Sequence, residues 1–74
     1  MDSMHKLLVE SGWTYFGGSN YALDDTRAKV ENLHLVLHPN GYKLWSTSER
    51  VFEIKFKLEA EKDVFWINKR YLKD

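Results

Sequence analysis

Apolar and charged residues alternate most regularly in the segment that begins at Val51. Four apolar residues occupy every second position and charged residues fill the positions between them: Phe52, Ile54, Phe56 and Leu58 alternate with Glu53, Lys55, Lys57 and Glu59. A period of two is typical of a β-strand with one buried face. We therefore expect the apolar side chains to point into the core and the charged ones to point into water.

The beginning of the chain shows a helical pattern instead. Met4, Leu7, Leu8 and Ser11 would share one face of a helix that runs from Asp2 to Gly12. Gly12 can adopt the left-handed conformation that commonly ends helices. Because a helix this short is not stable alone in water, we expect its apolar face to pack against a sheet.

Two adjacent glycines, Gly17 and Gly18, separate two segments rich in aromatic and apolar residues. We interpret the glycines as the turn of a β-hairpin that pairs Phe16 with Tyr21. A phosphate-binding loop would instead lead into a helix and often carry a lysine near its end. The residues that follow Gly18 show neither feature, which favours the turn.

The segment from Asp25 to His38 fits two patterns. Leu33, Leu35 and Leu37 alternate with other residues, which favours a strand, whereas Val30, Leu33 and Leu37 have helical spacing. We favour the strand and leave the helix open.

A turn after His38 leads into a second strand, and its register is open. A turn that places Gly41 in the left-handed conformation pairs His38 with Tyr42. A turn formed by Asn40 and Gly41 would pair Leu37 with Leu44. We favour the first, because Pro39 has no amide to donate in the second.

The C-terminal segment 64–68, Val-Phe-Trp-Ile-Asn, has the composition of a final strand, and 69–73 could instead form a helical tail. The fold class that these patterns predict is α+β, with a short N-terminal helix packed on an antiparallel β-meander of about five or six strands. The 74 residues form a single small domain, 1–74.

The composition and spacing of the residues argue against disulfides, metal sites and a hydrolytic active site. The chain has no cysteine, which excludes disulfides and thiolate zinc sites. His34 and His38 lie about 13 Å apart if their segment is a strand, which is too far to share a metal ion. The set Ser19, His34 and Asp25 has no spacing that indicates a hydrolytic site. We therefore expect no cofactor, no metal and no enzymatic activity.

The charge balance bears on location and partners. Eleven basic residues equal eleven acidic ones, so no net field attracts the protein to nucleic acid or anionic lipid. No apolar run approaches the length of a membrane span. We expect a soluble, cytoplasmic protein that does not bind membranes.

Aromatic residues make up 15% of the sequence, which is more than so small a core readily encloses. Apolar residues occupy both faces of the hairpin formed by 33–45, and one helix covers only one face. We therefore predict a small accessory protein, a regulator or inhibitor, that binds a larger protein partner, with a homodimer as a second use of the same surface. The expected protein-binding residues are Val36, Tyr42, Trp45, Lys55, Lys57 and Trp66.

The alternative is a protein that binds single-stranded RNA or DNA. Bases would stack on the tryptophans, at about 1 to 3 kcal/mol each, and lysines would neutralise phosphates. The residues expected for this function are Lys43, Trp45, Lys55, Lys57, Trp66, Lys69 and Arg70.

Overall fold

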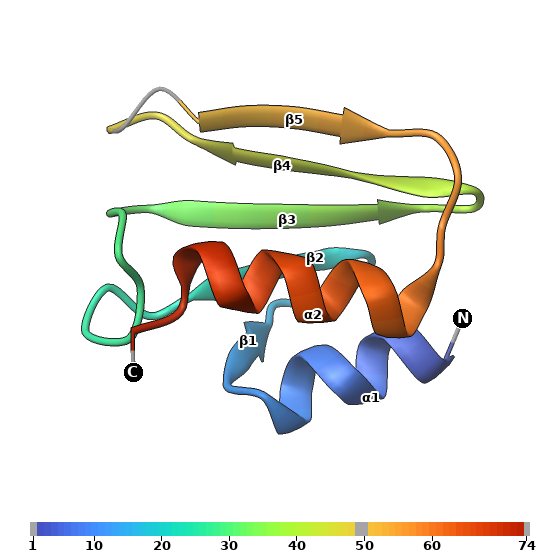
Figure 1. The fold of residues 1–74 in the computed structure, drawn as a ribbon, viewed down its shortest axis with the longest axis horizontal. Coiled ribbons are helices and arrows are strands. Elements are labelled where there is room, and N and C mark those ends of the chain that lie inside the picture. The colour runs from blue at the N-terminus through green and yellow to red at the C-terminus, as the bar shows by residue number, and fades with distance from the viewer. Residues whose placement is uncertain (1, 49–50, 74) are drawn as a thin grey trace.

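The protein is an α+β domain built on one antiparallel sheet (Figure 1). The computed structural model describes residues 2–48 and 51–73. Within these ranges the elements are α1 (Asp2–Glu10), β1 (Trp13–Tyr15), β2 (Asn20–Leu23), β3 (Leu33–His38), β4 (Gly41–Ser46), β5 (Val51–Lys55) and α2 (Ala60–Tyr71). The strands lie in the order β1-β2-β3-β4-β5, and each neighbouring pair is antiparallel. The predicted class, N-terminal helix and meander are confirmed.

Both helices pack on the same face of the sheet. Met4 and Leu8 of α1 lie in one core with Val64 and Ile67 of α2. The strands contribute the other large residues of this core, namely Trp13, Tyr21, Leu23, Leu33, Leu35, Tyr42 and Leu44. We call this side of the sheet the covered face.

The N-terminal helix forms as its pattern predicts. Met4 and Leu8 are buried, and the helix ends before Gly12, whose φ of 110° lies in the left-handed region. A hydrogen bond of 2.7 Å joins Nδ1 of His5 to the hydroxyl of Tyr21. This bond fixes α1 against β2.

The two adjacent glycines form a hairpin turn, which confirms their interpretation. Gly17 and Gly18 both have positive φ, and the amide of Phe16 donates to the carbonyl oxygen of Asn20 at 2.9 Å. Tyr15, rather than Phe16, lies opposite Tyr21. The predicted pairing is therefore wrong by one residue.

The next hairpin has a register that differs from both predicted ones. His38 pairs with Gly41 and Leu37 pairs with Tyr42, so only Pro39 and Asn40 form the turn. Proline suits the first central position of a turn, where its fixed φ is favourable and no amide is needed. Of the segment 25–38, only Leu33–His38 is a strand.

The predicted C-terminal strand is wrong, because its residues lie in α2. Val64 and Ile67 are buried and Tyr71 is partly buried, and their spacing of three and four residues places them on one face of a helix. Asp63 helps to begin the helix, because its Oδ2 accepts a 2.8 Å hydrogen bond from the amide of Glu59. Packing of this stripe overrides the β-propensity of the segment.

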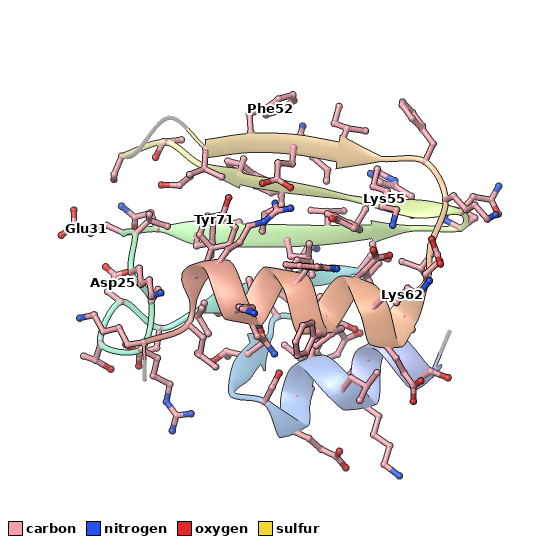
Figure 2. All side chains as sticks on the ribbon, viewed as in Figure 1. Asp25, Glu31, Phe52, Lys55, Lys62 and Tyr71 are labelled. Atoms are coloured by element: carbon pink, nitrogen blue, oxygen red, sulfur yellow. The ribbon has the colours of Figure 1, made fainter. Side chains whose placement is uncertain are left out.

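The predicted orientation of the alternating segment 52–59 is also wrong for three of its four apolar residues. Phe52, Ile54 and Phe56 are 62%, 48% and 83% exposed, and only Leu58 packs against the core. Figure 2 shows Phe52 on the side of β5 away from α2, and Lys55 toward it.

Charged residues of α2 explain this orientation. Arg70 donates two hydrogen bonds, of 2.9 and 2.8 Å, to the carboxylate of Glu53. The hydroxyl of Tyr71 donates to the same carboxylate at 2.8 Å. Lys55 contacts Asp63 with an N–O distance of 2.6 Å. The charged side of β5 therefore faces α2, and its apolar side faces outward.

Gly41 allows β4 and β5 to approach closely. A Cβ at this position would lie 1.8 Å from the backbone carbonyl oxygen of Lys55. We expect Gly41→Ala to lower the free energy of unfolding by about 1 to 3 kcal/mol, because a backbone atom cannot rotate away. Urea unfolding measures the effect, with Asn40→Ala, in the exposed turn, as the control. Equal stability of the two variants would contradict this close approach.

Two groups with raised pKa values should make the folded protein less stable at alkaline pH. Desolvation raises the pKa of Tyr42 above its ordinary value of 10.0, and the charges of Asp63 and Glu53 add to this shift. The hydrogen bond to Asp63 raises the pKa of Lys55. Both groups keep their protons better in the folded state, so their stabilising contribution is complete at low pH and is lost as the pH rises through the folded-state pKa.

The urea midpoint should therefore fall as the pH rises above about 10, the pKa of tyrosine in the unfolded chain. The fall should be smaller in Tyr42→Phe, which removes one contributing group, while Tyr21 and Tyr71, whose pKa values burial also raises, remain. A midpoint that stays constant over this range in the wild type would contradict the prediction.

Candidate functional site

The side of the sheet opposite the helices carries a group of apolar and aromatic side chains. We call it the open face and define it by the strand residues whose side chains point away from the helices, with apolar or aromatic members concentrated on β3, β4 and β5. These are Thr14, Asn20, Ala22, His34, Val36, His38, Lys43, Trp45, Phe52 and Ile54. None of the helices that the structure describes packs on this face, because both contribute to the core on the other.

Aromatic rings cross the centre of the open face in a row. Trp45 lies opposite His34 on one side and opposite Phe52 on the other. The rings of His34 and Trp45 are stacked, with centroids 5.3 Å apart and an interplanar angle of 25°. The Lys43 ammonium lies 5.4 Å from the Trp45 centroid and 5.6 Å from the Phe52 centroid. Stacking holds the row in place before any ligand binds.

A second row continues the apolar surface toward the β3–β4 turn. Val36 lies opposite Lys43, which lies opposite Ile54. Beyond this row is a hollow of about 430 Å³ whose lining includes Pro39, Ile54 and Phe56. The open face is thus a shallow apolar surface with a hollow at one end.

The charges on the open face have one sign. Lys43 is its permanently charged group, and no aspartate or glutamate occurs among the strand residues described on this face. Asp24 and Asp25 lie at one corner, where they line a small hollow with Ala22 and His34. A hydrogen bond from the backbone amide of Thr26 lowers the pKa of Asp24. The centre of the face therefore favours a ligand that supplies a negative charge.

The structure divides the residues that the sequence predicts as a binding site. Val36, Lys43 and Trp45 lie together on the open face. Tyr42 is only 6% exposed and belongs to the core. Lys55 faces α2 and is engaged by Asp63 and Glu59.

The remaining predicted residues lie elsewhere. Trp66, Lys69 and Arg70 belong to α2, and Lys57 is exposed in the segment that follows β5. The Trp66 ring makes an edge contact with Phe65 at 5.7 Å. Trp45 therefore lies on the open face, whereas Trp66 lies on α2, where it lines a hollow with Glu53 and Ile54 of β5.

Phe52, Ile54 and Phe56 are residues of this surface that the sequence analysis places in the core. The charge pattern of the C-terminal segment could have indicated which side of β5 faces the helices. Asp63 and Arg70 lie seven residues apart, on one face of a helix, and they match Lys55 and Glu53, which lie two residues apart on one face of a strand.

Other kinds of site gain no support from the described part of the chain. Residues 2–48 and 51–73 contain no group of three or more histidine, aspartate or glutamate side chains placed to hold a metal ion. The helices in these ranges are too short and too polar to cross a bilayer.

Comparisons of the chain with protein-family models, with curated proteins and with solved structures give no significant match.

Proposed function

We propose that the protein is a non-enzymatic binding module that docks on a larger protein through the open face of its sheet, and so acts as a regulator or inhibitor. The observation that supports this most strongly is the exposure of large apolar residues beside Trp45. Phe52 and Ile54 are 62% and 48% exposed although they lie in a regular strand. Contiguous apolar surface of this kind is typical of binding sites.

Charge and shape define the partner. Trp45 and Phe52 are the anchors, because aromatic residues contribute most of the energy of many interfaces. Lys43 lies over both rings, and its ammonium would be desolvated when a partner covers them. The partner should therefore present an apolar segment with a carboxylate that pairs with Lys43.

Site-specific cross-linking tests this proposal. A photoreactive phenylalanine analogue is placed at Phe52 in one variant and at Phe65 in the other. The two residues are similarly exposed, at 62% and 59%, but Phe65 lies on α2. Irradiation in the cells of origin should give a discrete protein adduct from position 52 and not from position 65.

Lys43→Glu provides the matched control for this experiment. The substitution should reduce the adduct from position 52 by at least about tenfold, since like charges would meet at the centre of the interface. Equal adducts from positions 52 and 65, or an adduct that Lys43→Glu leaves unchanged, would contradict the proposal.

The same surface supports a second candidate function, the binding of single-stranded RNA or DNA. Trp45 and Phe52 offer ring faces for bases, and Lys43 lies between them with no carboxylate on the face to compete. Oligonucleotide should then quench tryptophan fluorescence with a strong dependence on salt. The Trp45→Phe variant should lose most of that quenching, whereas Trp66→Phe should retain it. Absence of quenching at low salt would eliminate this candidate.

A further inference from the structure

We infer that the free edge of β5 is a self-association site, at which β5 pairs antiparallel with β5 of a second copy of this chain. Figure 1 shows β5 at the outer edge of the sheet. Its one partner among the described strands is β4. Edge strands of this kind present unpaired backbone groups that favour pairing with another strand.

The backbone of β5 has the orientation that such pairing needs. The carbonyl oxygen of Lys55 points toward β4, since it approaches the position of a Cβ on Gly41. Backbone groups alternate in direction along a strand. The amide and carbonyl groups of Phe52 and Ile54 therefore point to the free edge.

In one register of the two β5 strands, oppositely charged residues lie opposite each other and aromatic residues lie opposite each other. If the two-fold axis passes beside Ile54, Glu53 of each copy, which also pairs with Arg70 of its own α2, lies opposite Lys55 of the other, which also pairs with its own Asp63. Phe52 of each copy then lies opposite Phe56, the residue that follows β5 in the other copy. Because the two copies are related by a two-fold axis, each of these contacts occurs twice. Cross-strand pairs of opposite charge or of aromatic rings stabilise antiparallel sheets.

The other registers lack this match. An axis beside Glu53 would bring the two Glu53 carboxylates together, and an axis beside Lys55 would bring the two ammonium groups together, which is unfavourable. An axis beside Phe52 would place Glu53 opposite Val51, so no pair of opposite charges would form within β5. Packing of two open faces would cover Lys43 of each copy without a carboxylate at the centre of the face to pair with it.

The pairing joins two sheets edge to edge, so both open faces lie on the same side of the dimer. It therefore enlarges the surface assigned above to a partner, but it does not depend on that assignment.

Single-cysteine variants test the register directly, because the chain has no cysteine of its own. Residues that face each other across antiparallel strands have Cα separations of about 4.5 to 5.5 Å, which a disulfide spans. Ile54→Cys should form a disulfide-linked dimer under mild oxidation at least about tenfold faster than Phe52→Cys, whose two copies would lie about 13 Å apart. Mixing Phe52→Cys with Phe56→Cys should give the heterodimer as the faster product.

Light scattering on the wild-type chain measures the association without any substitution. We expect the mass to rise toward that of a dimer as the concentration increases. A monomer at all concentrations up to about 1 mM, corresponding to less than about 4 kcal/mol of association, would overturn the inference. Fastest disulfide formation by Glu53→Cys, or by Val36→Cys at the centre of the open face, would overturn it as well.

Discussion

Replacing Leu44 with alanine should lower the free energy of unfolding by about 2 to 5 kcal/mol, whereas replacing Phe52 should lower it by less than about 1 kcal/mol. Leu44 is fully buried on the covered face. Phe52, on the neighbouring strand, is 62% exposed on the open face. Alternation alone suggests the opposite for Phe52, since a buried phenylalanine would cost about 3 to 5 kcal/mol on truncation.

Urea unfolding of the two variants decides between these orientations. It should be measured at two protein concentrations, because self-association would make the midpoint depend on concentration. A loss of several kcal/mol for Phe52→Ala at both concentrations would mean that β5 presents its apolar side to the helices.

Replacing Asp63 with alanine should lower the free energy of unfolding by about 2 to 3 kcal/mol. The side chain is almost completely buried, with 4% of its surface exposed. Its carboxylate accepts hydrogen bonds from the Lys55 ammonium and from the amide of Glu59. The variant would therefore lose the ion pair with Lys55, one of the two links between α2 and β5 described above, and leave a backbone amide at the start of the helix without its acceptor.

Glu61→Ala is the control for Asp63→Ala, because Glu61 is an exposed acid in the same first turn of α2. Its loss should cost less than about 1 kcal/mol, the size of an interaction with the helix dipole. Similar losses for the two variants would show that the Asp63 carboxylate contributes only as a charge near the helix end.

Local patterns predict the parts of the fold that depend on local geometry. Helix α1 follows from the spacing of Met4 and Leu8, and the turn at Gly17 and Gly18 follows from the need for positive φ. The order of the meander follows from its short connections.

The parts that the sequence analysis misses depend on what an element packs against. Alternation in β5 shows that Phe52 and Glu53 point in opposite directions, but not which direction faces the helices. Charged residues such as Glu53 turn inward because Arg70 and Tyr71 provide partners. Because the sequence analysis places Phe52 in the core, it does not include Phe52 in the predicted binding surface. Because it assigns 64–68 to a strand, it does not predict the helix that carries Arg70 and Tyr71.

The central claim is that one face of the sheet is open and apolar, and hydroxyl-radical footprinting of the dilute protein tests it most directly. After each rate is divided by the intrinsic reactivity of its residue type, Phe52 and Ile54 should be oxidised about as fast as Phe65 on the outer side of α2, and Leu35 and Leu44 should be protected. Protection of Phe52 and Ile54 to the level of Leu44 would contradict the account.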